Sequence, residues 1–240
     1  MNDIEESTKR TRQREISRRY IQIPVDFLIK HNITPNKISL IGFILSLIGS
    51  LLIAFGWMYA FLWFSWLVPA FIGLAGTFDI LDGEVARRTG KETPAGAYLD
   101  SILDRLSDAL LILGLIYGGL IDYLLGYIIL FLVIMISYTR SRAENEGVNM
   151  IGIGKMERAE RILFLLFTIM GELIFYFSTE LIFGAPTTVP IIPFITRVPV
   201  SPIFLIGIII FIFTLVYTII QRLSHTFKYL KNVSGNEEEI

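Results

Sequence analysis

Six long apolar segments constrain the fold of this 240-residue chain more than any other feature. Each is about as long as a helix that crosses a bilayer, which takes roughly 20 mostly apolar residues. With 53% hydrophobic and only 18% charged residues, the sequence predicts an all-α, polytopic membrane protein with six transmembrane helices. These helices are expected at about residues 38–55, 58–80, 96–119, 122–139, 160–183 and 202–221.

Polar segments flank the predicted membrane domain, which we expect to comprise residues 14–228. Residues 1–13 are predicted to be a flexible polar N-terminus, and residues 229–240 a disordered tail. Residues 14–31 mix basic and apolar side chains, which predicts an N-terminal amphipathic juxtamembrane helix. Because proline interrupts a helix, we expect this helix to bend or restart at Pro24.

The distribution of basic residues predicts the orientation in the membrane. They precede the first span, occupy the segments between spans two and three and between spans four and five, and follow the sixth span. Arg197 is the only basic residue on the other side. The positive-inside rule therefore predicts a multi-pass protein of the cell membrane, with both termini on the cytoplasmic side.

Four aspartates lie around the polar junction between the second and third predicted spans. Asp79 and Asp82 are three residues apart and Asp100 and Asp104 are four apart, so each pair projects from one face of a helix. Carboxylates beside apolar spans are costly unless they are paired, hydrated or bound to metal. Together they predict an oxygen-rich site for one or two hard divalent cations; ordinary helix-capping and surface aspartates are the alternative.

Other metal and nucleophile chemistries have little support in the sequence. The chain has no cysteine, which excludes disulfides, thiolate nucleophiles and cysteine-ligated zinc. His31 and His225 are too far apart in sequence to suggest a histidine-based metal site. Carboxylates with divalent cations bind phosphates, and arginines bind them directly, so the acidic and basic residues on one side favour phosphoryl chemistry.

The spacing of the acidic segment resembles the signature of the CDP-alcohol phosphotransferase family. All fixed positions of that signature are matched by Asp79-x-x-Asp82-Gly83-x-x-Ala86-Arg87 and, after eight intervening residues, Gly96-x-x-x-Asp100-x-x-x-Asp104. The resemblance implies that Asp79, Asp82 and Asp100 ligate two Mg²⁺ or Mn²⁺ ions. It implies that Asp104 either ligates one of them or acts as the base that deprotonates the acceptor alcohol, and we favour the base.

The resemblance also implies the substrates and the reaction. The CDP-lipid, CDP-diacylglycerol or CDP-archaeol, is expected to bind at Gly83, Ala86, Arg87 and Gly96. An acceptor hydroxyl then attacks the lipid-linked phosphate, CMP leaves, and a phospholipid phosphodiester is formed. The family resemblance implies a homodimer among membrane lipids, and we expect no nucleic-acid partner.

The acceptor is expected to be inositol phosphate. Segments 137–147 and 154–162 look like those of phosphatidylinositol-phosphate synthases and their archaeal counterparts. An acceptor that carries a phosphate needs an anion site, for which the candidates are Arg140, Lys155, Arg158 and Arg161. Positive-inside topology alone would also place cations there, and glycerol 3-phosphate or serine are alternative acceptors.

Proteins of other classes also bury aspartates in membranes. A cation-coupled transporter is expected to show an internal repeat, and the acidic pattern has no second copy. Membrane prenyltransferases use paired aspartate motifs that are widely separated in sequence. A scaffold or lipid-binding protein would leave the carboxylate spacing unexplained.

Overall fold

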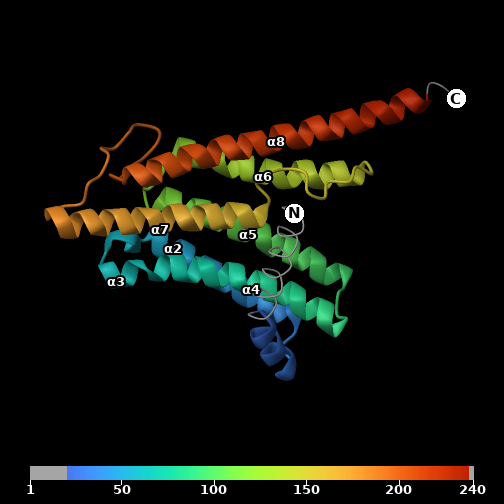
Figure 1. Cartoon of the computed structure of the whole chain (residues 1–240), viewed down its shortest axis with the longest axis horizontal. Coiled ribbons are helices and arrows are strands. Elements are labelled where there is room, and N and C mark those ends of the chain that lie inside the picture. The colour runs from blue at the N-terminus through green and yellow to red at the C-terminus, as the bar shows by residue number, and fades with distance from the viewer. Residues whose placement is uncertain (1–20, 238–240) are drawn as a thin grey trace, which may run out of the picture. The chain divides into compact units, whose positions relative to one another are not determined.

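The computed structural model describes residues 21–237, so the segment predicted to be flexible, 1–13, lies outside the described residues. Within the described range the chain is helical and forms no strand beyond one isolated bridge between Val189 and Val200 (Figure 1). Residues 21–30 are helical through Pro24. The elements that follow are α2 (Pro35–Ala54), the 3-10 turn η1 (Trp57–Tyr59), α3 (Leu62–Ser65), α4 (Leu67–Thr89), α5 (Pro94–Tyr117), α6 (Tyr123–Asn145), α7 (Arg158–Phe183) and α8 (Pro202–Glu237).

Five helical segments are long and apolar enough to cross a membrane, which supports the predicted membrane protein. They are Pro35–Ala54, Leu62–Thr89, Tyr123–Asn145, Arg158–Phe183 and Pro202–Val233. The third predicted span corresponds to α5, which has the expected length but carries Asp100, Asp104, Arg105 and Asp108. Because of these charges α5 is not among the five, and the sixth span stays a prediction.

Three helices continue beyond the ends predicted for their spans. α6, expected to end at residue 139, continues to Asn145. The second predicted span was expected to end at residue 80, but α4 continues to Thr89 because no glycine or proline follows Gly83 until Gly90. At Gly90 the backbone turns left-handed, with a φ of 63°, as is common after a helix C-terminus. The tail expected to be disordered from residue 229 is instead helical to Glu237, because no proline after Pro202 interrupts α8.

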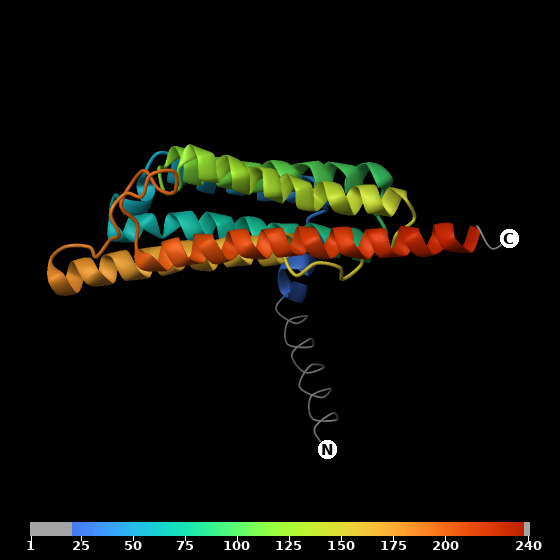
Figure 2. The same ribbon diagram turned by 90° about the horizontal axis from the view of Figure 1, so that it is seen from above.

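The described residues group into two compact units where the sequence analysis expected one domain. Unit 1 contains residues 21–45 and 74–104, and unit 2 contains residues 46–73 and 105–237. Within unit 2, α8 packs against both α6 and α7 (Figures 1 and 2). A single domain over residues 14–228 stays a prediction.

In unit 1, residues 21–30 pack one face against α2 and α4. Val25 and Leu28 are buried in a cluster with Ile38 of α2 and with Leu81 and Val85 of α4. The opposite face of residues 21–30 exposes large apolar side chains, as expected for an amphipathic segment at a membrane surface. These contacts fix the second half of α4 close to the start of α2.

In unit 2, glycines allow helices to approach closely. A Cβ at Gly114 of α5 would lie 2.7 Å from the backbone oxygen of Ser50 in α2, and one at Gly118 would lie 2.4 Å from that of Ile53. Small residues let membrane helices approach closely, and the structure shows this at these two positions.

We expect Gly114→Ala to lower the free energy of unfolding by about 1–3 kcal/mol, because the added methyl group meets backbone atoms that cannot move aside easily. Thermal unfolding in detergent measures this loss. Gly73→Ala is the matched control, since its Cβ would meet only Leu166, at an ordinary 3.7 Å. Equal stability of the two variants would contradict the packing argument.

Candidate active site

Three of the four predicted metal-binding aspartates converge in unit 1. Asp79 and Asp82 project from α4 and Asp100 from α5, and one carboxylate oxygen from each lies within 4.8 Å of the others. Three ionised carboxylates at this separation repel one another by about 3 kcal/mol per pair at an effective dielectric constant of about 20. The Asp82 carboxylate is only 6% exposed, and its Oδ2 has no hydrogen-bond partner among the described residues. This donor set fits a divalent cation, which binds carboxylate oxygens and offsets their repulsion.

Local sequence explains why these carboxylates meet. The turn at residues 90–93 joins α4 to α5, and Pro94 occupies the first position of α5, where proline needs no backbone hydrogen bond. The Thr93 hydroxyl accepts a hydrogen bond of 3.0 Å from the Gly96 backbone N–H, which caps the start of the helix. The short turn places the last two helical turns of α4 near the first two of α5.

A cavity of about 480 Å³ lies beside these carboxylates in unit 1. Asp82 and Asp100 line this cavity. So do all four residues predicted to bind the CDP-lipid, which are Gly83, Ala86, Arg87 and Gly96. A Cβ at Gly83 would meet only the Arg87 Nη1, at 3.9 Å, so the absence of a side chain there leaves open space. The structure thus places the four predicted residues around one cavity large enough for a small-molecule group.

Asp104 is not part of the three-carboxylate group. It follows Asp100 by four residues in α5 and is partly exposed. Its carboxylate is not among those that lie within 4.8 Å of one another, and its role as the base, with metal ligation as the alternative, stays a prediction.

Two of the predicted acceptor-phosphate residues meet at a buried carboxylate in unit 2. Arg161 is 5% exposed and donates from Nη2 to Asp108 Oδ2 at 2.6 Å and from Nη1 to the Met156 carbonyl oxygen at 3.2 Å. The Arg158 Nε lies 3.7 Å from Asp108 Oδ1. Arg158 and Arg161 therefore share a face of α7, as their three-residue spacing predicts.

The sequence analysis missed Asp108. The available signal was its position four residues after Asp104, which continues the spacing of Asp100 and Asp104 along α5. It lies outside the family signature, and its partners come from α7, so no local pattern connected it with them.

The other two predicted acceptor residues are more exposed. Arg140 forms an ion pair of 2.9 Å with Glu144, one turn later in α6. The Lys155 ammonium group lies 5.9 Å from the centroid of the Tyr217 ring. Neither contacts Asp108 in the described structure.

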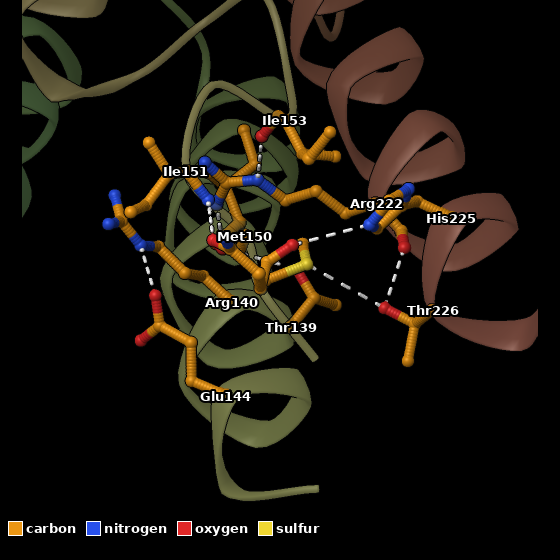
Figure 3. Close-up of polar contacts among 11 residues, drawn as sticks. Thr139, Arg140, Glu144, Met150, Ile151, Ile153, Arg222, His225 and Thr226 are labelled. Carbon is orange, nitrogen blue, oxygen red and sulfur yellow. Dashed lines mark hydrogen bonds and ion pairs between the residues drawn. The ribbon is translucent and has the colours of Figure 1, made fainter. Parts of the chain in front are cut away.

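A buried arginine of α8 was also missed. Arg222 is 2% exposed and donates to the backbone carbonyl oxygens of Ile153, at 3.1 Å, and Ile136. Figure 3 shows its side chain extending from α8 toward Ile153, near Arg140. It forms no ion pair with a described carboxylate, and the positive charges of Arg140 and Arg161 act on it. A charged residue in an apolar span was the signal, but the sequence analysis counted Arg222 with the C-terminal tail.

Comparison with known proteins identifies the class to which this fold and carboxylate group belong. Residues 32–227 match the model of the CDP-alcohol phosphatidyltransferase family. Because this match covers most of the chain, the protein belongs to that family, and it is a transferase. The resemblance in the acidic segment is thereby confirmed, and the transporter, prenyltransferase and scaffold alternatives are set aside.

Within this family, the chain is similar to synthases of inositol phospholipids. The chain is 40% identical over 134 residues to an archaetidylinositol phosphate synthase of Pyrococcus horikoshii, covering 55% of this chain and 67% of that protein. It is 37% identical over 97 residues to an archaetidylinositol phosphate synthase of Methanothermobacter thermautotrophicus, covering 40% of this chain and about half, 49%, of that protein. A phosphatidylinositol phosphate synthase of Streptomyces avermitilis is 31% identical over 146 residues, with 58% of this chain and 57% of that protein covered.

Solved structures show the same fold. The phosphatidylinositol phosphate synthase of Mycobacterium tuberculosis with CDP-DAG bound matches with a TM-score of 0.65 and 25% identity, over 87% of this chain and 94% of that one. The same enzyme in complex with manganese and citrate matches with a TM-score of 0.64 and 25% identity, over 86% and 88% of the two chains. With the carboxylate group described above, the manganese complex indicates that this protein is a divalent-metal enzyme.

Proposed function

We propose that this protein transfers a phosphatidyl-type group from a CDP-lipid to a hydroxyl of inositol phosphate and releases CMP. The observation that carries the proposal is the three-carboxylate group, in which a buried Asp82 oxygen without a partner borders a cavity lined by the family signature. Membership of the family and similarity to synthases of both inositol lipids support the choice of reaction.

The proposed mechanism assigns the signature residues as follows. Asp79, Asp82 and Asp100 hold two divalent cations, and Gly83, Ala86, Arg87 and Gly96 hold the nucleotide of the CDP-lipid. Bound there, Mg²⁺ or Mn²⁺ would neutralise the diphosphate and stabilise the leaving oxygen.

Asp104 takes the proton from the acceptor hydroxyl as its oxygen forms a bond to the lipid-linked phosphorus. The bond from that phosphorus to the oxygen of CMP breaks in the same displacement. The electron pair leaves with CMP, so this route requires no covalent enzyme intermediate.

The arginines of unit 2 supply the anion site that a phosphorylated acceptor requires. The Arg161 Nε is buried without a hydrogen-bond partner among the described residues, and such a donor is costly unless a ligand oxygen meets it. Buried Arg222, which forms no ion pair with a carboxylate of residues 21–237, adds a further positive charge. Arg158 lies beside Arg161, and we assign Arg140 and Lys155 to the outer part of the site. Arginine suits this role because its planar guanidinium matches phosphate geometry.

We further infer that both termini and the active site face the cytoplasm and that the protein works as a homodimer. The distribution of basic residues supports the orientation, and the homodimer rests on the family resemblance alone. The similarity to archaetidylinositol phosphate synthases makes CDP-archaeol a candidate beside CDP-diacylglycerol.

The deciding experiment measures CMP release by the purified protein with Mg²⁺ and either CDP-lipid. Inositol 1-phosphate, glycerol 3-phosphate and serine are offered in parallel. We expect metal-dependent release with inositol 1-phosphate. Release with glycerol 3-phosphate alone would keep the mechanism and replace the acceptor, whereas release with serine alone would remove the role of the arginines.

A further inference from the structure

We propose that Asp108 is a positioning residue, which holds Arg161 and Arg158 in the orientation that binds the phosphate of the acceptor. The inference rests on the proposed function, because it takes these arginines as the phosphate site. Asp108 lies outside the family signature and was not among the residues assigned a role above. It is a buried charged group for which the proposed chemistry otherwise has no use.

The first argument is geometric. Each oxygen of the Asp108 carboxylate faces a different arginine, with Oδ2 2.6 Å from Arg161 Nη2 and Oδ1 3.7 Å from Arg158 Nε. The Met156 carbonyl oxygen holds the Arg161 Nη1 at 3.2 Å. Because a guanidinium group is planar, fixing both terminal nitrogens also fixes the direction of the Nε–H bond. That remaining donor, without a described partner, is the one we assign to the phosphate.

The second argument concerns charge. Arg158 and Arg161 are three residues apart on α7, and the positive charge of Arg161 also acts on buried Arg222. Like charges held together at low exposure repel one another unless an anion lies among them. Asp108 offsets the charges of Arg158 and Arg161, and the more distant carboxylates of Glu157 and Glu144 act on Arg222. The three arginines together with Asp108 keep a net positive charge. The cluster is therefore stable without substrate and still attracts a phosphate dianion.

The third argument is that Asp108 neither contacts the acceptor phosphate directly nor serves only to stabilise the fold. Asp108 and Arg161 border a cavity of only about 10 Å³, lined otherwise by apolar side chains and with space for at most one water molecule. This cavity therefore has no room for an acceptor phosphate beside Asp108 or beside the face of Arg161 that borders it. A phosphate reaches the pair from the side of Arg158, whose side chain is 21% exposed, and Asp108 acts through the arginines. A buried ion pair among apolar residues also adds little stability compared with an apolar pair of similar volume, so its presence favours a functional role.

The test compares Asp108→Asn with wild type in steady-state kinetics of CMP release. Asparagine keeps the size of the side chain and removes its charge. We expect the KM for inositol 1-phosphate to rise by about 10- to 100-fold, the range known for losing a residue that orients a metal ligand, which we apply here to an arginine that binds phosphate. The KM for the CDP-lipid and the kcat at saturating acceptor are expected to stay close to wild type.

Two further variants make the result specific. Glu160→Gln removes one negative charge from the exposed first turn of α7 and is expected to leave the acceptor KM unchanged. Asp108→Glu keeps the carboxylate and is expected to recover most of the loss. If the asparagine variant does not fold, the acceptor KM of the glutamate variant, compared with that of Asp108→Leu, carries the test.

Separate readouts distinguish the two proposals. The choice of acceptor by wild type tests the proposed function, and the change in KM for whichever phosphorylated acceptor is used tests Asp108. An unchanged acceptor KM in Asp108→Asn would overturn the positioning role. An equal rise in the KM of both substrates together with lost thermal stability would also overturn it, because Asp108 would then be purely structural.

Discussion

Asp104→Asn is expected to lower the kcat for CMP release by about 10²- to 10⁴-fold, the contribution typical of a positioned general base. Asparagine keeps the shape of the side chain but cannot accept a proton from the acceptor hydroxyl. Because Asp104 lies outside the three-carboxylate group, the affinity for divalent metal is expected to stay near that of wild type. Single-turnover CMP release and metal titration of the same preparation measure the two quantities.

Asp26→Asn provides a matched control for this variant. Asp26 is an exposed carboxylate of unit 1 that pairs with Arg88 at 3.2 Å, away from the cavity lining. Its replacement is expected to leave turnover unchanged. Full activity of Asp104→Asn would refute the base role, and a loss of activity that excess metal restores would identify Asp104 as a ligand instead.

Asp82→Asn is expected to abolish measurable activity at metal concentrations that saturate wild type, a loss of at least about 10³-fold in kcat/KM. Asp82 supplies the most buried carboxylate of the group, with an oxygen that no described residue satisfies. Chelation of divalent metal from wild type is expected to have the same effect, and added Mg²⁺ or Mn²⁺ is expected to reverse it.

Thermal stability gives an independent check on the same site. Metal at 100 times its dissociation constant stabilises a folded protein by about 2.7 kcal/mol, so metal is expected to raise the unfolding temperature of wild type but not of Asp82→Asn. Without metal, Asp82→Asn is expected to unfold at a higher temperature than wild type, because asparagine removes one of three mutually repelling carboxylates. A variant that is still stabilised by metal as strongly as wild type would show that Asp82 is not a ligand.

The predictability of the candidate site depended on how far apart its residues lie in sequence. The spacing of Asp79 and Asp82 placed both on one face of a helix, and the same held for Asp100 and Asp104. The short turn between α4 and α5 leaves the two helices few possible arrangements, so the two pairs of aspartates must lie close together. Three of these four carboxylates meet in the structure as a consequence.

Helix boundaries were less predictable than the helices themselves. Every predicted span overlaps a long helix, because long apolar segments must satisfy their backbone hydrogen bonds internally. The second predicted span, 58–80, is interrupted near its start, where η1 and α3 precede α4. Hydropathy, however, falls where a helix leaves the membrane, and the helix itself can continue into the polar residues beyond that point. α4 therefore continues beyond residue 80 through the polar residues that carry Asp82, and α8 continues past 229.

The sequence alone indicated the family, through the resemblance of its acidic segment to a known signature. It also determined the all-helical membrane fold and the helix faces that carry the signature, because these follow from composition and from the fixed period of a helix. Only the tertiary structure decided which arginine side chains are buried and which carboxylate faces them. Asp108 and Arg161 are 53 residues apart, and Arg222 meets the Ile136 carbonyl oxygen across 86 residues. Such contacts depend on how α5, α6, α7 and α8 pack in unit 2, and packing of this kind leaves no periodic trace in the sequence.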